Sequence, residues 1–117
     1  MSDGVTGLGG VFFRAHDPDA LKAWYEETLG VPKEELMRSD GLVFGIFRAD
    51  TDYFGASGQG FMVNFRVASL DGVLERLRAA GAEVDEETQD QEGVGRFGWA
   101  VDPEGNRFEL WEPAEGM

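Results

Sequence analysis

The chain has 117 residues, which is enough for a single domain with an ordinary hydrophobic core. Its net charge of −13, from 23 acidic and 10 basic side chains, argues against nucleic acid and anionic membranes as partners. Cysteine is absent, so disulfides, thiolate nucleophiles and zinc–sulfur sites are excluded.

The N-terminal end carries no recognisable export signal. Residues 1–7 are rich in small residues, and we expect them to be frayed. No basic segment followed by an apolar run occurs in residues 1–10, and no apolar stretch approaches the ~20 residues that cross a bilayer. We therefore expect a cytoplasmic protein with no membrane partner.

A strand and a helix open the chain. Residues 8–15 alternate in the manner of a β-strand, with Phe12 and Arg14 on one face. Asp17-Pro18 then predicts a helix start, and apolar residues at helical spacing predict an amphipathic helix over residues 18–29. Gly30 predicts its end.

The middle of the chain is less regular. Residues 35–38 predict a short strand and residues 42–48 a clearer one. A turn at residues 50–52 and a short extended piece at Tyr53 follow, and then a flexible link at residues 55–60.

The second half repeats the first. Residues 61–67 predict a strand, Ser69 caps a predicted helix, and Gly81 ends it. Residues 82–84 are predicted to be extended, and the polar residues 85–92 are predicted to form a loop.

The last predicted element is a β-hairpin. Aromatic and β-branched residues flank the turn formers Asp102-Pro103-Glu104-Gly105-Asn106. In the second arm, Phe108 and Leu110 lie on one face and Glu109 on the other, between an arginine and a tryptophan.

The two halves of the sequence match each other. Phe13-Arg14 recurs as Phe65-Arg66, 52 residues later, and the helix starts and terminal glycines follow the same order. We interpret this as an internal duplication within a single domain of residues 1–117. The two modules are predicted to span about residues 8–56 and 60–115.

The chain resembles the vicinal oxygen chelate superfamily, which includes glyoxalase I, bleomycin-resistance proteins, fosfomycin-resistance enzymes and extradiol dioxygenases. The residues that carry the resemblance are the segment 95–112 with its turn, the helix over 19–30 with Trp24-Tyr25, and the repeated strand starts. The resemblance implies an α+β fold, in which two tandem βαβββ modules form a curved, cup-shaped mixed sheet with the helices outside. It also implies a homodimer and a small-molecule ligand in the cup.

Enzymes of the superfamily hold a divalent metal ion in the cup. Mapped by motif, three of the ligand positions fall on Gly10, Met62 and Glu109, whereas the fourth, in the last strand of the first module, cannot be placed. Only Glu109 offers a ligand for a hard cation, and a catalytic zinc normally takes about three protein ligands. The sequence therefore predicts no metal site and no cofactor.

The cup-facing residues support two interpretations. In one, Glu109 forms a salt bridge with Arg14 or Arg66. In the other, the two arginines hold an anionic or carbonyl-bearing molecule that stacks on aromatic rings. The predicted ligand-binding residues are Phe12, Arg14, Tyr53, Met62, Asn64, Arg66, Trp99, Glu109 and Trp111, and Arg107 also faces the cup.

Three residues are expected to lie outside the site. His16, the single histidine, falls off the cup-facing register and is predicted to be a solvated loop residue. Trp24 and Tyr25 lie on the first helix and are predicted to belong to the core or to an interface.

The sequence favours a metal-free, small-molecule-binding protein of unidentified ligand. The alternative is a metal-dependent enzyme of glyoxalase or dioxygenase type, with Glu109 as metal ligand or general base. A third hypothesis is a structural or partner-binding role for the acidic outer surface.

Overall fold

The computed structural model describes residues 4–31, 36–37, 42–56 and 58–115. Two helices and eight strands make up this described part of the chain. In chain order they are β1 (Val5–Ala15), α1 (Pro18–Leu29), β2 (Leu36–Met37), β3 (Leu42–Arg48), β4 (Phe61–Val67), α2 (Leu70–Ala79), β5 (Glu83–Val84), β6 (Gln89–Gln91), β7 (Gly95–Val101) and β8 (Arg107–Pro113).

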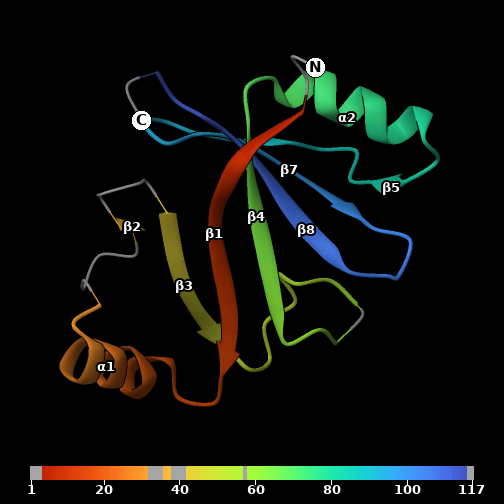
Figure 1. Ribbon diagram of the computed structural model, residues 1–117. Helices are drawn as coiled ribbons and strands as arrows, with labels where there is room; N and C mark the ends of the chain where they lie inside the picture. Colours follow the sequence, from red (N-terminus) through yellow and green to blue (C-terminus); the bar gives the residue numbers. More distant parts are fainter. Residues whose placement is uncertain (1–3, 32–35, 38–41, 57, 116–117) are drawn as a thin grey trace.

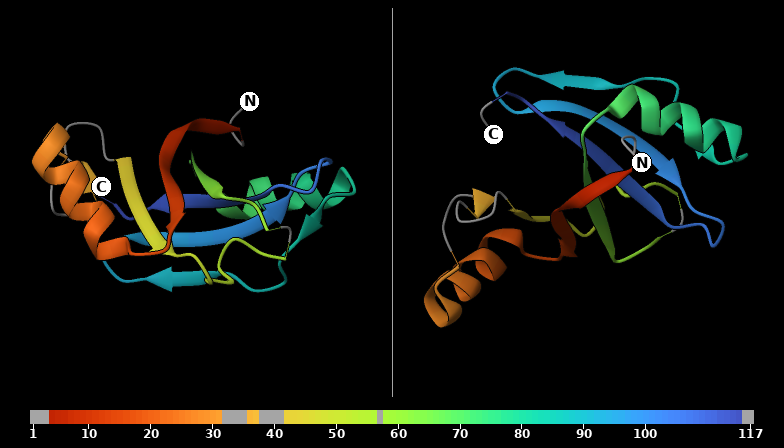
Figure 2. Two further views of the ribbon diagram at one scale, coloured as in Figure 1. Left: turned by 90° about the horizontal axis from the view of Figure 1, so that it is seen from below. Right: turned by 45° about the horizontal axis from the view of Figure 1, so that its top comes forward.

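The described strands form one mixed sheet in the order β2-β3-β1-β4-β8-β7-β5, with β6 paired to β7 off this path. The long strand β1 pairs antiparallel with β4 at the centre, and each of these two strands has a parallel neighbour, β3 and β8 respectively. The helices lie at opposite ends of the sheet, α1 beside β3 and α2 beside β7 (Figures 1 and 2). This architecture confirms the predicted α+β fold class with a curved sheet. The module limits at residues 8–56 and 60–115 stay a prediction.

Helix α1 begins and ends as the sequence predicts. The Asp17 carboxylate accepts a hydrogen bond from the backbone N–H of Ala20 at 3.1 Å, and Gly30 ends the helix with a positive φ of 72°. No residue of α1 is buried. Its apolar face is therefore covered only in part within one chain. In the described part of the chain, neither helix is long and apolar enough to cross a membrane.

Helix α2 covers the face of the sheet opposite the cup. Ser69 caps it by accepting a hydrogen bond from the backbone N–H of Gly72 at 3.2 Å. Leu70 and Leu74 are buried and pack with Leu110 of β8 in the larger aliphatic core. The N-terminus of α2 is thereby fixed against the last strand.

Two predicted segments are corrected by the structure. Residues 5–7, which we expected to be frayed, extend β1, and Val5 pairs with Val67 of β4. Residues 89–91, expected to lie in a loop, form β6 and pair with β7. Periodicity could not find β6 because all three of its residues are exposed, so it shows no alternation of apolar and polar residues.

The hairpin turn is held by one carboxylate. Asp102 Oδ1 accepts hydrogen bonds from the backbone N–H groups of Glu104 and Asn106, both at 2.9 Å. Asp102 Oδ2 accepts a third bond from the side chain of Asn106 at 3.1 Å. These bonds lower the pKa of Asp102, with the backbone bond from Asn106 the largest cause. The predicted turn is therefore stabilised by its own side chains.

Candidate functional site

Strand pairing brings alternate residues of four strands to one face of the sheet. Phe12 of β1 lies opposite Met62 of β4. Asn64 of β4 lies opposite Glu109 of β8, and Glu109 lies opposite Trp99 of β7. Because side chains alternate along each strand, these residues share the face turned away from α2. This is the inward register expected from the sequence.

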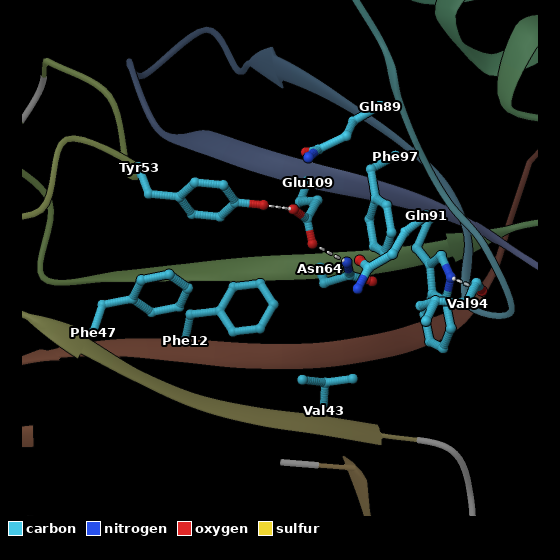
Figure 3. Close-up of a pocket in the computed structure, with 11 residues that line it drawn as sticks. Phe12, Val43, Phe47, Tyr53, Asn64, Gln89, Gln91, Val94, Phe97 and Glu109 are labelled. Atoms are coloured by element: carbon cyan, nitrogen blue, oxygen red, sulfur yellow. Dashed lines mark hydrogen bonds between the residues drawn. The ribbon is translucent and has the colours of Figure 1, made fainter. Parts of the chain in front are cut away.

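A cavity of about 310 Å³ opens on this inner face. Its volume lies at the lower end of the range for small-molecule sites. Figure 3 shows the aromatic rings and polar side chains around the Glu109 carboxylate. The lining residues come from both halves of the chain: Phe12, Val43, Phe47, Tyr53, Asn64, Gln89, Gln91, Val94, Phe97, Glu109 and Trp111.

Glu109 is the buried acidic group of this cavity, with only 2% of its surface exposed. Oε2 accepts hydrogen bonds from the hydroxyl of Tyr53 and from the indole Nε1 of Trp99, the latter at 3.0 Å. Oε1 accepts a bond of 2.5 Å from the Asn64 side-chain amide. Three neutral donors from three different segments therefore hold one carboxylate.

Burial raises the pKa of Glu109 above the ordinary value for a carboxyl group. The hydrogen bonds from Tyr53, Asn64 and Trp99 act in the opposite direction, as does the charge of Arg107, but the desolvation of the carboxylate is the larger effect. A proton on Glu109 is therefore held more tightly than on an exposed glutamate.

Tyr53 reaches the site from the segment between β3 and β4. Its ring stacks on Phe47 with centroids 5.2 Å apart, and its backbone carbonyl accepts a hydrogen bond from Arg107. Burial, and then the charge of Glu109, raise the pKa of the Tyr53 hydroxyl, which keeps it in its donor form. The stacking and the backbone contact fix the hydroxyl against the carboxylate.

The two arginines expected in the cup do not line this cavity. Arg14 donates hydrogen bonds of 2.7–2.9 Å to three backbone carbonyls, those of Gln59, Ala49 and Thr51. The guanidinium of Arg66 lies 4.9 Å from the centroid of the Trp111 ring. The predicted salt bridge of Glu109 with Arg14 or Arg66 is wrong for the described residues, because neutral donors surround the carboxylate.

Arg107 is also bound elsewhere, in a bidentate ion pair with Asp85 at 3.0 and 3.1 Å. Asp85 is half-buried, although it opens the polar stretch 85–92 that the sequence predicted to be a loop. Met62 and Trp99 are buried beside the cavity in a cluster with Phe12 and Phe54. Their role as ligand contacts stays a prediction.

Six of the lining residues were not predicted from the sequence. Val43 and Phe47 belong to β3, whose face could be assigned only after its parallel pairing with β1 was known. Phe97 lies in the first arm of the hairpin, two residues before Trp99, and alternation along that arm would have found it. No sequence signal identifies the remaining three, which come from β6 and its turn: Gln89, Gln91 and Val94.

The three residues that the sequence placed outside the site do not line the cavity. His16 is exposed between β1 and α1, as expected for a solvated loop residue. Trp24 is 51% exposed on α1, so it lies outside the core of the chain. Tyr25 contacts Trp24 and Phe44 edge to face, at 5.1 and 5.2 Å between centroids.

The described residues do not fit the metal site that the resemblance implies. Gly10 has no side chain, and a Cβ built there would lie 2.2 Å from the backbone oxygen of Val43. Met62 is fully buried, and a thioether is a poor ligand for hard cations. The described residues contain no group of three or more His, Asp or Glu side chains that could hold a metal ion.

The strand pairing also places the fourth ligand position. Glu109 pairs with Asn64 in the parallel ladder of the second half, and Gly45 pairs with Phe12 in the equivalent ladder of the first half. Asn64 lies two residues after the mapped position Met62, and Phe12 lies two residues after the mapped position Gly10. The residues paired with Asn64 and Phe12 are therefore equivalent, so Gly45 is the counterpart of Glu109. Three of the four positions therefore carry no donor for a hard cation.

Comparison with known sequences agrees with this fold. The family model of the glyoxalase-like domain matches residues 10–111. The CFP32 proteins of Mycobacterium bovis and Mycobacterium tuberculosis, which carry the provisional name glyoxylase, are 29% identical over 105 residues. The match covers 83% of this chain but only 40% of each relative, so the chain spans less than half the length of these proteins.

Solved structures of similar fold include two epimerases. Methylmalonyl-CoA epimerase from Mycobacterium tuberculosis has a TM-score of 0.72 at 23% identity, covering 97% of this chain and 92% of its own. The Streptomyces coelicolor enzyme in complex with 2-nitronate-propionyl-CoA has a TM-score of 0.66 at 21% identity, covering 95% of this chain and 99% of its own. The hypothetical protein BH1468 of Bacillus halodurans has a TM-score of 0.69 at 9% identity, covering 100% of this chain and 99% of its own. At such identities the likeness concerns the fold.

Proposed function

This chain belongs to the glyoxalase-like domain family, within the vicinal oxygen chelate superfamily, and on that premise we propose that it binds a small aromatic molecule in the cavity beside Glu109 without a metal ion. Affinity would come from stacking on the aromatic walls and from hydrogen bonds to the polar lining. No bond of the ligand need be made or broken.

One observation carries this proposal. Of the four positions that correspond to metal ligands in the superfamily, Gly10, Gly45 and Met62 offer no donor for a hard cation, and Glu109 is held by neutral donors. A single carboxylate does not make a metal site. The same carboxylate lines a cavity with five aromatic side chains, which suits an organic ligand.

The names of the relatives suggest other activities. The CFP32 proteins are provisionally called glyoxylases, and the epimerases act on methylmalonyl-CoA. Neither activity is assigned to this chain, because three of its four mapped ligand positions carry no donor for a hard cation and because the chain covers only 40% of the CFP32 length.

Metal titration tests the proposal. Purified protein, freed of metal with a chelator, is melted with and without Mn²⁺, Ni²⁺ and Zn²⁺. We expect Tm to be unchanged by each ion, since a ligand stabilises a protein only when it binds the folded state. Under the same conditions, a library of small aromatic compounds should contain members that raise Tm and quench the fluorescence of the wild type.

Glu109→Gln provides the control for metal binding. A rise in Tm with a divalent ion that the wild type shows and Glu109→Gln loses would contradict the proposal, because Glu109 would then be a metal ligand. Glu104→Gln removes the same charge from the exposed hairpin turn and controls for non-specific ion binding.

A second candidate function is proton transfer by Glu109. The raised pKa of a carboxyl group that lines a ligand cavity favours it, since a general base works best with a pKa near the operating pH. Exchange of a ligand proton for deuterium, followed by NMR and lost in Glu109→Gln without loss of binding, would favour this candidate over simple binding.

We also propose that the protein acts as a homodimer. Trp24 and Leu29 of α1 are 51% and 65% exposed, and Phe61 of β4 is 55% exposed. These exposed apolar side chains are the contacts that we propose between two copies of the chain.

A further inference from the structure

The charge of the cavity lining points to one class of ligand. Glu109 is the acidic residue among the described lining residues, and no lysine, arginine or histidine side chain occurs among them. The rest of the lining is aromatic, aliphatic or amide-bearing. A ligand in this cavity therefore meets one carboxylate and no cation of the described chain.

The described arginines that the sequence placed in the cup are already bound by other groups. Arg14 donates to three backbone carbonyls, and Arg107 holds Asp85 in a bidentate ion pair. Arg66 lies over the Trp111 ring. To gain a counter-charge from the described residues, an anionic ligand would have to break such contacts, and it would also be repelled by Glu109.

A ligand that carries a positive charge or a hydrogen-bond donor would instead be attracted by Glu109. Oε1 of Glu109 accepts one hydrogen bond from the described residues, that of Asn64, and a carboxylate oxygen has room for a second. Aromatic faces, such as those of Phe12, Phe97 and Trp111 in the lining, attract cations through their quadrupoles. The chain charge of −13 favours the approach of cations over anions.

On the basis of the proposed binding function, we infer that the cavity selects planar aromatic ligands that carry a cationic N–H group, such as an amidinium or a protonated amine, and rejects anions. In this arrangement the cationic group of the ligand contacts Glu109. The aromatic ring of the ligand lies between the aromatic side chains that the two halves of the chain contribute. Gln89 and Gln91, which are exposed, form the polar edge of the cavity. Figure 3 shows Gln89 on the opposite side of Glu109 from Phe12 and Val43.

Three matched probes test the inference. The compounds 2-naphthamidine, 2-naphthamide and 2-naphthoate share one ring system and differ in charge. Binding to the wild type is followed by NMR, through the chemical shifts of the indole N–H groups of the three tryptophans. Trp99 and Trp111 lie at the site, and Trp24 on α1 is the internal control.

We expect the amidine to bind at least about tenfold tighter than the amide, and the carboxylate to bind weakest, as a desolvated charge pair and cation–π contacts would give. The resonances of Trp99 or Trp111 should shift and that of Trp24 should not. Glu109→Gln should bring the amidine and the amide within about threefold of each other, whereas Glu104→Gln should keep the wild-type order.

Two results would overturn the inference. If the carboxylate binds as tightly as the amidine and shifts the site tryptophans, charge selection is wrong while small-molecule binding stands. If no probe shifts Trp99 or Trp111, both the charge selection and the binding function fail. The three-probe comparison uses the wild type, so it remains decisive even if Glu109→Gln does not fold.

Discussion

At the scale of single residues, the site is defined by the partners of Glu109. A carboxylate among aromatic rings needs donors, because removing a charge from water without compensation costs several kcal/mol. Tyr53, Asn64 and Trp99 supply neutral donors, so the charge is compensated without a cation in contact. With no cation of the described chain in contact with it, the Glu109 carboxylate can accept a hydrogen bond from a ligand.

The raised pKa of Glu109 predicts a pH dependence of stability. In the unfolded chain the group titrates near its ordinary value of 4.5, whereas in the folded protein its pKa is higher. Stabilisation by the bound proton is therefore complete below pH 4.5 and is lost as the pH rises through the folded-state pKa. The pKa of Tyr53, whose hydroxyl faces the carboxylate, is raised as well, so this hydroxyl stays protonated across the range.

The measurement is urea unfolding of the wild type and Glu109→Gln between pH 4 and pH 8. The free energy of unfolding of the wild type, minus that of the variant, should fall as the pH rises. A difference that rises with pH would contradict a raised pKa at Glu109. The subtraction removes the contribution of other carboxylates, including Asp102.

Gly10 shows why the mapped metal position cannot be refilled. We expect Gly10→Ala to destabilise the protein by about 1–3 kcal/mol, because the added Cβ meets the backbone oxygen of Val43 rather than a flexible side chain. Gly7→Ala, on the same strand and with nothing within 4 Å of the added Cβ, is the matched control. Equal stability of the two variants in urea unfolding would show that β1 and β3 can separate without cost.

At the scale of elements, the hairpin β7–β8 organises the site. Its second strand carries Glu109 on the cup face and Leu110 on the helix face, so one strand serves both the cavity and the core. Its first strand supplies Trp99 and Phe97 and pairs with β6 at the cavity edge. The register of the hairpin therefore decides whether Glu109 meets its donors.

The Asp102 turn sets that register. We expect Asp102→Ala to lower Tm by a few degrees, because the turn loses the acceptor for two backbone N–H groups and one side-chain amide. Glu104→Ala in the same turn keeps the Asp102 carboxylate and should melt close to the wild type. A Tm for Asp102→Ala equal to that of Glu104→Ala would show that the flanking strands alone hold the turn.

At the scale of the whole molecule, the described chain is open in shape. Its radius of gyration is 14.8 Å, and its extents are 44 × 34 × 22 Å. A compact domain of this length would have a radius of gyration of about 13 Å. Helix α1 buries none of its residues, although its sequence is amphipathic. Association of two such chains would bury apolar side chains of α1 that a single chain leaves exposed.

We therefore expect the purified protein to have twice the 12.9 kDa chain mass in light scattering coupled to size exclusion. Trp24→Ser should shift the protein toward the monomer on dilution, because it removes an exposed aromatic ring from α1. Glu27→Ser, also exposed on α1, is the control. A wild type that is monomeric at every concentration would contradict the homodimer.

Local features of the amino-acid sequence specify much of this protein. Alternation and helix caps predict the elements, the repeat indicates the fold class, and Gly10 and Met62 show that two of the mapped ligand positions lack a donor. Each of these features depends only on residue type and short spacing. The order of the amino acids is therefore sufficient to identify them.

The tertiary structure decided what those residues contact. Arg14 faces the cup register yet binds backbone carbonyls, Tyr53 reaches Glu109 from 56 residues away, and the exposed strand β6 forms the cavity edge. Gly45 could be assigned only through the parallel pairing of β3 with β1. Such contacts depend on how distant segments meet in space, and neither periodicity nor composition carries that information.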